Sequence, residues 1–225
     1  MKNYKLVVIE GVDSSGKQTQ SELLMSNIES MGLSVEKIVF PNYDSDTSSL
    51  VKMYLGGEFG ENANDVNPYM ASAFFAVDRV GSMFSVWKQR LENTQIVIAD
   101  RYVTSNMIHQ ASKIENPEER DAFLDWVYDF EYEKLSLPKP DLIIFLDMPV
   151  KYAVELMKNR PNKINSSDIK DIHESDEAYL NKSYNNAVSV AKKYNWHTVS
   201  CVKDGKIRSI DDISEEIFNV FKTII

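Results

Sequence analysis

Short runs of apolar, mostly β-branched residues alternate along the chain with longer segments in which apolar residues recur at helical spacing. This alternation is typical of a parallel sheet whose two faces are both covered by helices. The apolar runs predict five strands, at residues 6–9, 35–40, 96–99, 142–146 and 198–202. The helical segments predict helices at residues 17–31, 68–91, 105–113, 117–133, 150–159, 174–194 and 210–225. The pattern therefore predicts an α/β fold, with a five-stranded parallel sheet flanked by helices.

Two segments lack either period, and we interpret both as loops. Residues 56–67 are rich in Gly and Asn, and residues 160–170 mix Asn, Ser and Lys after a proline. With 225 residues, 43% of them apolar, and no internal repeat, the chain is long enough for one sizeable core. We therefore expect one domain that spans residues 1–225.

Composition excludes several kinds of partner. The net charge of −9 opposes binding to a phosphate-rich polymer, so no nucleic acid is expected. The single cysteine, Cys201, cannot form an internal disulfide, and the three scattered histidines have no metal-binding spacing. The N-terminus shows no leader pattern, and no apolar run approaches the roughly 18 residues that cross a bilayer. We expect a cytoplasmic protein with no membrane contact.

The first apolar run leads into a glycine-rich loop and then a helix, in the segment EGVDSSGKQT. Gly11 and Gly16 allow the backbone N–H groups to face one anion, and Lys17 can reach the β- and γ-phosphates of a nucleotide. A strand before the loop and a helix after it are the context that a P-loop requires. We predict that ATP binds to the loop residues Gly11, Val12, Asp13, Ser14, Ser15, Gly16, Lys17, Gln18 and Thr19.

Gln18 stands where a P-loop usually carries the Ser or Thr that ligates Mg²⁺. An amide oxygen can bind a hard cation, so Gln18 is one candidate metal ligand; alternatively, carboxylates and water hold the ion. Asp100 is a second candidate, because it ends the third apolar run, at the edge where open α/β sheets bind ligands. Arg101 follows it and can grip a phosphate with two donors. The nearby P-loop favours this interpretation over a surface ion pair.

The order of the segments EGVDSSGKQTQ, FPNY, FFAVDR, DRYVTSN and LPKPDLIIFLD resembles that of the thymidylate kinase family over most of the chain. The resemblance implies a P-loop kinase fold with a lid at about residues 160–173. It also implies in-line transfer of the γ-phosphoryl of ATP, with Mg²⁺, to a deoxynucleoside monophosphate, above all dTMP, whose product is dTDP. Such a reaction needs only that the phosphates are positioned and their charge stabilised. The partners that the resemblance implies are small-molecule nucleotides.

The same resemblance assigns an acceptor site. It places Asp13 near the transferred phosphate, Tyr43 and Arg101 near the acceptor phosphate, and Phe75 and Arg79 on the acceptor base. Phe75 and Arg79 are four residues apart, so they leave one face of a helix. The implied acceptor residues are Asp13, Phe40, Tyr43, Phe75, Arg79, Arg101, Ser105, Asn106, Gln110, Asp171 and Glu174.

The chain departs from the family in two places. Where relatives often have Ala-Tyr-Gln-Gly, it has Ile108-His109-Gln110-Ala111, which leaves base selectivity open. In the family, the catalytic arginine comes from either the P-loop or the lid. Ser14 and Ser15 occupy the P-loop position here, so the resemblance implies that a lid cation replaces it, with Arg160 as the first candidate and Lys163 as the second. A solvated basic loop is the alternative for these cations, and helix capping is the alternative for Asp171 and Glu174. The predicted catalytic residues are Asp13, Lys17, Arg101 and Arg160.

Apolar residues occupy two sides of the helix predicted at 68–91, which is more than one core-facing stripe requires. One side fits the core and the other fits a subunit interface, in agreement with the homodimers of the family.

Two other functions stay open. A deoxynucleoside kinase would need a general base beyond the second strand, where Asp44 is the nearest acid. The second alternative is a protein that binds nucleotides for regulation and has lost turnover, because Gln18 replaces the usual Mg²⁺ ligand.

Overall fold

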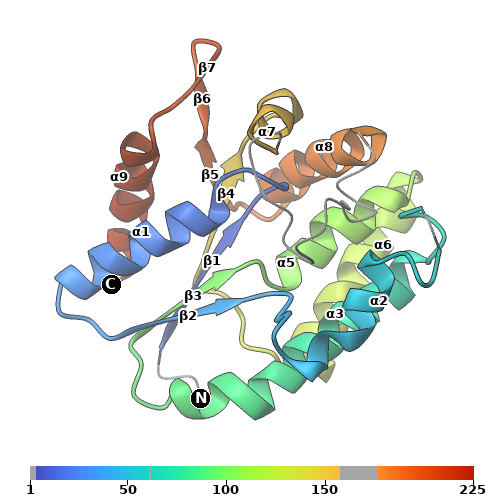
Figure 1. Ribbon diagram of the computed structural model, residues 1–225, viewed down its shortest axis with the longest axis horizontal. Coiled ribbons are helices and arrows are strands. Elements are labelled where there is room, and N and C mark those ends of the chain that lie inside the picture. Colours follow the sequence, from blue (N-terminus) through green and yellow to red (C-terminus); the bar gives the residue numbers. More distant parts are fainter. Residues whose placement is uncertain (1–3, 61, 158–176) are drawn as a thin grey trace.

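A computed structural model describes residues 4–60, 62–157 and 177–225, and its central layer is a five-stranded parallel sheet (Figure 1). The strands lie in the order β2-β3-β1-β4-β5. Their bounds are β1 Lys5–Glu10, β2 Val35–Val39, β3 Ile96–Asp100, β4 Leu142–Asp147 and β5 His197–Ser200. All pairings within this sheet are parallel, which confirms the predicted fold class.

The predicted fifth strand, 198–202, is wrong at its carboxyl end. β5 stops at Ser200, and the chain enters a two-stranded antiparallel hairpin of β6 Val202–Lys203 and β7 Lys206–Ile207. Asp204 and Gly205 form its two-residue turn, with φ values of 51° and 73°. Asp-Gly is a preferred pair for such turns because both residues must adopt positive φ.

Helices cover both faces of the sheet (Figure 1). The longer ones are α1 Lys17–Ser30, α2 Ser49–Leu55, α3 Pro68–Ser82, α6 Pro117–Tyr128, α7 Val150–Met157, α8 Glu177–Lys193 and α9 Ile210–Phe221. α1 and α9 pack on the face that carries Val7 and Ile9 of β1. The neighbouring residues Leu6 and Val8 point to the other face, where side chains of α6 and α8 pack. Strands that bury both faces need consecutive apolar residues, which is the pattern of β1.

Four predicted helices contain a change of helical type. The segment predicted at 68–91 continues from α3 through a π-helical turn, Met83–Trp87, into α4 Lys88–Arg90. The segment predicted at 105–113 begins earlier, as α5 Val103–Ser105, and continues as π-helix Asn106–Gln110 and 3₁₀-helix Ala111–Lys113. The segment predicted at 117–133 is α6 followed by π-helix Asp129–Lys134, and α9 is followed by 3₁₀-helix Lys222–Ile224.

Two short elements between β2 and α3 were not predicted. A 3₁₀-helix, Asp46–Ser48, leads directly into α2. The loop prediction at 56–67 agrees with the turns that the structure has in its described part, although Ala63 and Val66 are buried there. α3 then begins at an Asn67 cap, whose side chain accepts from the Met70 N–H, with Pro68 in the first turn.

Candidate active site

The P-loop joins β1 to α1, and its two glycines have different physical roles. Gly16 has φ of 90°, a left-handed conformation that a side chain would strain. Gly11 lies so close to the loop that a Cβ would stand 2.5 Å from Ser15 Oγ and 3.1 Å from the Leu146 carbonyl oxygen. The hydroxyl oxygens of Ser14 and Ser15 are buried and have no hydrogen-bond partner in the described part of the chain. Such a loop retains donors for an anion.

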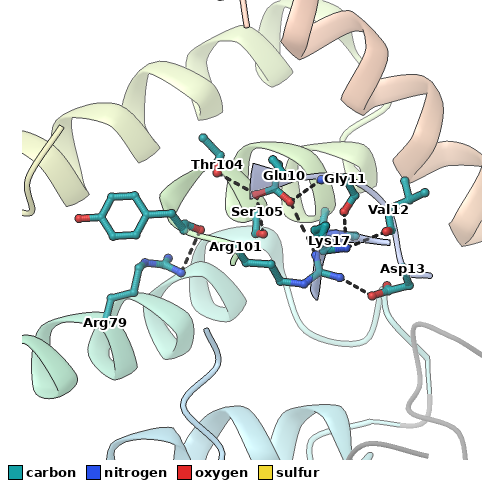
Figure 2. Close-up of polar contacts among 11 residues, drawn as sticks. Glu10, Gly11, Val12, Asp13, Lys17, Arg79, Arg101, Thr104 and Ser105 are labelled. Carbon is teal, nitrogen blue, oxygen red and sulfur yellow. Dashed lines mark hydrogen bonds and ion pairs between the residues drawn. The ribbon is translucent and has the colours of Figure 1, made fainter. Parts of the chain in front are cut away.

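Lys17 folds back over this loop. Its ammonium donates to the carbonyl oxygens of Gly11, at 2.9 Å, and Val12, at 2.7 Å (Figure 2). Burial and the nearby charge of Arg101 lower the pKa of Lys17 to about 7, against the opposing effect of Asp13, Asp100 and Glu10. A bound phosphate would add negative charge here and so favour the charged lysine.

Arg101 brings a second cation to the same edge of the sheet. It follows β3 with φ of 65°, a left-handed conformation that costs a non-glycine residue about 1 kcal/mol. Its guanidinium donates to Asp13 of the P-loop and lies 3.8 Å from Glu10 (Figure 2). It also donates to His109 Nε2 at 3.0 Å. Although burial opposes the charged form, the carboxylates of Asp13, Glu10 and Asp100 raise the pKa of Arg101 above its ordinary value. The predicted association of Asp13, Lys17 and Arg101 is therefore present.

Glu10 is a residue of this cluster that the sequence analysis missed. It ends β1, is fully buried, and accepts from the hydroxyls of Thr104 and Ser105, each at 2.8 Å, and from the Gly11 N–H at 3.0 Å. Its contacts tie the P-loop to the segment after β3. An acid at the end of an otherwise apolar buried strand was the signal that could have identified it. The hydrogen bond from Ser105 to Glu10 places this predicted acceptor residue beside the P-loop.

The two predicted metal ligands differ in position. Asp100 ends β3 beside Ile9 of β1, is buried, and acts electrostatically on both Lys17 and Arg101. Gln18 is exposed on α1, and its amide donates to Glu22 at 3.1 Å. Within the described ranges, no group of three or more His, Cys, Asp or Glu side chains could hold a metal. Mg²⁺ commonly binds to one or two carboxylates together with substrate phosphates and water, so Asp100 fits the ion.

Tyr43 and Phe75, which the resemblance assigns to the acceptor, lie in one aromatic cluster. Both pack against the buried side chains of α2, and the Phe75 ring meets the Tyr54 ring edge-on at 6.1 Å. Tyr43 also acts electrostatically on Arg101, so the cluster adjoins Arg101 and its partners. Phe40 differs, because its ring is buried in the main core against Trp87 and Tyr102.

Arg79 has protein partners for much of its guanidinium. It is buried and donates from Nε and Nη2 to Glu131, at 2.6 and 2.7 Å. Its Nη1 donates to the Tyr102 carbonyl at 3.3 Å, a contact that Figure 2 marks with a dashed line. Asn106 donates to the same Glu131 at 2.8 Å. Gln110 is buried, and its Oε1 accepts no hydrogen bond from the residues that the structure describes. Contact of Arg79, Asn106 and Gln110 with a base stays a prediction.

The predicted lid, about 160–173, lies outside the described residues. The same is true of Arg160, Lys163, Asp171 and Glu174. The end of the helix predicted at 150–159 and the start of that predicted at 174–194 fall there too. Their roles stay predictions.

A P-loop and an opposing arginine at the carboxyl edge of a parallel sheet define a P-loop phosphotransferase. The sequence profile of the thymidylate kinase family matches residues 9–212 of the chain. The chain therefore belongs to the thymidylate kinase family, as its motifs predict. It is an ATP- and Mg²⁺-dependent kinase, and the reaction of its family is the phosphorylation of dTMP.

Individual relatives agree with this family. The chain is 34% identical over 160 residues to a thymidylate kinase of Mycobacterium tuberculosis, across 70% of this chain and 72% of that protein. It is 30% identical over 202 residues to a probable thymidylate kinase of Saccharolobus solfataricus, across 89% and 90% of the two chains. The solved thymidylate kinase of Candida albicans shares its fold, with a TM-score of 0.70, 21% identity, and coverage of 98% of this chain and 92% of that chain.

None of the helices in the described ranges has the length and apolar character needed to cross a membrane.

Proposed function

We propose that the cluster at the carboxyl edge of β1 and β3 divides the reaction between two cations. Lys17 binds the donor phosphates, and Arg101 binds the acceptor phosphate. The observation that carries this division is that Lys17 begins the helix after β1, whereas Arg101 follows β3, and that both cations face the same carboxylates, Glu10 and Asp13. An incoming phosphate replaces Asp13 as the partner of Arg101 and the two carbonyl oxygens as partners of Lys17. In each case the cation forms a charge-assisted hydrogen bond with the phosphate, and the backbone does not have to move.

The remaining residues position the two nucleotides. Tyr43 and Phe75 hold the acceptor, and Asp100 holds Mg²⁺ directly or through its waters. Mg²⁺, when bound, neutralises charge on the transferring phosphoryl group. Arg160, from the lid, is the further cation that the family resemblance requires. No covalent intermediate is needed, because positioning and electrostatics supply the rate.

The protein works as one cytoplasmic kinase domain that pairs with a second copy of itself. Support for the pairing comes from α3 and the π-helix after it, where Met70, Val77 and Phe84 are 55%, 52% and 64% exposed. These residues are seven apart, so they follow one face of the helix. Large exposed apolar side chains in a row are typical of an interface.

Arg101→Ala tests the division of roles. We expect the KM for dTMP to rise about tenfold to a hundredfold, because a buried charge-assisted contact to phosphate is lost, while the KM for ATP stays unchanged. Initial rates in a coupled ADP-release assay measure both constants. Arg90→Ala is the control, since Arg90 pairs with Glu36, near the amino end of β2, and should alter neither constant. An equal rise in both constants would place Arg101 on the donor side.

The same assay, together with calorimetry, separates the two alternative functions. Turnover with thymidine and none with dTMP, dUMP or dGMP would indicate a deoxynucleoside kinase. Calorimetric binding of ATP and dTMP without phosphoryl transfer, in either Mg²⁺ or Mn²⁺, would indicate a regulator that has lost turnover. We expect transfer to dTMP.

A further inference from the structure

His109 contacts the acceptor-side arginine from an element other than the P-loop. It lies in the π-helical segment Asn106–Gln110, its ring is buried, and its Nε2 is 3.0 Å from Arg101 Nη1. The guanidinium therefore has one partner in the P-loop, Asp13, and another on the helical segment that follows β3. Neither the P-loop motif nor the Asp-Arg pair requires the second contact.

The chemistry of the two groups determines which one donates. An arginine side chain has five N–H donors, no acceptor, and a permanent positive charge. His109 Nε2 must therefore accept, so the imidazole is neutral and carries its proton on Nδ1. A protonated ring would present an N–H toward a cation and would lose this contact.

Further contacts hold the backbone of His109 and pack against its ring. The His109 carbonyl accepts from the Ser112 hydroxyl at 2.8 Å and from the Tyr179 hydroxyl at 3.2 Å. The His109 and Tyr179 rings are stacked, with centroids 6.4 Å apart and planes inclined by 23°. Tyr179 belongs to α8, so that helix packs on the imidazole and also bonds to the backbone that carries it. This is the arrangement expected of a group that orients another side chain.

We propose that His109 is a positioning residue that keeps the Arg101 guanidinium directed toward the acceptor phosphate; this rests on the proposed role of Arg101. A carboxylate such as Asp13 binds the guanidinium through charge and so competes with a phosphate. A neutral imidazole nitrogen orients the guanidinium but adds no full negative charge at the site. When the phosphate displaces Asp13, His109 remains as the hydrogen-bond partner that fixes the side chain, while Glu10 stays farther away, at 3.8 Å.

The experiment compares His109→Leu with His109→Gln. Leu removes the acceptor, whereas the Gln amide oxygen stands the same number of bonds from Cα as Nε2 and can accept from Arg101. By calorimetry without the second nucleotide, we expect Leu to weaken dTMP binding about tenfold, with ATP binding unchanged. The Gln variant should stay within about threefold of the parent protein. Both variants lose the stacking on Tyr179, so a purely structural role would affect them alike.

Three results would overturn the proposal: unchanged dTMP binding in His109→Leu, equal loss in both variants, or equal loss for dTMP and ATP. The double variant with Arg101→Ala separates this proposal from the role of Arg101. If His109 acts through Arg101, His109→Leu causes no further loss of dTMP binding in that background. If Arg101→Ala alone leaves dTMP binding intact, the proposed role of Arg101 fails. If His109→Leu is equally harmful with and without Arg101, only the proposal for His109 fails.

Discussion

The contact between Arg79 and Glu131 joins α3 to the π-helix after α6 in the protein interior. Glu131 is 0% exposed and accepts two hydrogen bonds from Arg79 and one from Asn106. Removing one member of a buried ion pair leaves an uncompensated charge in a medium of low polarity. If Arg79 contacts the acceptor base, as predicted, its ion pair with Glu131 holds the guanidinium in position for that contact.

We expect Glu131→Gln to lower the free energy of unfolding by about 3–5 kcal/mol, because Arg79 then stays charged and buried without a counter-charge. Replacing both Arg79 and Glu131 by Met should cost less than this single change, since no unpaired charge remains. Urea unfolding at fixed pH and protein concentration measures both. The control is Asp121→Asn, which breaks the exposed pair with Lys193 and should cause a much smaller loss. An equally small loss in Glu131→Gln would show that solvent screens the buried pair.

The sequence predicted the residues that a local motif places, and missed those whose partners come from distant segments. Asp13, Lys17 and Arg101 follow strand ends, and parallel strands bring these ends to one edge. Glu10 and Glu131 were missed because their partners are 94 and 52 residues away along the chain. The contact between His109 and Arg101 spans only eight residues, but the packing of Tyr179 on His109 joins residues 70 apart, and spacing in the sequence does not report it.

Among the elements, the 3₁₀-helix Ala111–Lys113 is connected to α2 and its following loop by the partly buried amine of Lys113. Lys113 donates to the Tyr54 hydroxyl at 2.8 Å and to the Val66 carbonyl at 3.3 Å. Burial lowers the pKa of Lys113 to about 7, from an ordinary value of about 10.5. Between these values the unfolded chain binds a proton that the folded chain does not, so stability should rise with pH.

Lys113→Met tests this dependence. We expect the free energy of unfolding of the parent protein, relative to the variant, to be constant below pH 6. It should then increase from pH 7 to pH 9 by up to about 1.4 kcal/mol per pH unit. Lys17 is present in both proteins, so its own titration cancels in the difference. Urea unfolding at each pH gives the two curves. A difference that does not change with pH would mean that Lys113 keeps an ordinary pKa.

Element type was easier to predict than element ends. Long segments of helical spacing gave helices, and the consecutive apolar runs gave the five strands of the sheet. α2 was missed because seven residues are too short to establish a period. The π-helical turns were also missed, since one added residue shifts the register of a helix without changing its composition. The Asp204-Gly205 turn was a recognisable hairpin signal.

For the molecule as a whole, the apolar row on α3 and its π-helical extension makes the proposed dimer testable. A glutamate at Val77 would place a charge in the centre of the row, where a paired copy would have to desolvate it. We expect Val77→Glu to halve the mass measured by size-exclusion chromatography with light scattering. Val188→Glu is the matched control, because Val188 is a similarly exposed valine, 41% against 52%, on α8 outside the row. A single-chain mass for the parent protein, or the same loss of mass in both variants, would refute this row as the interface.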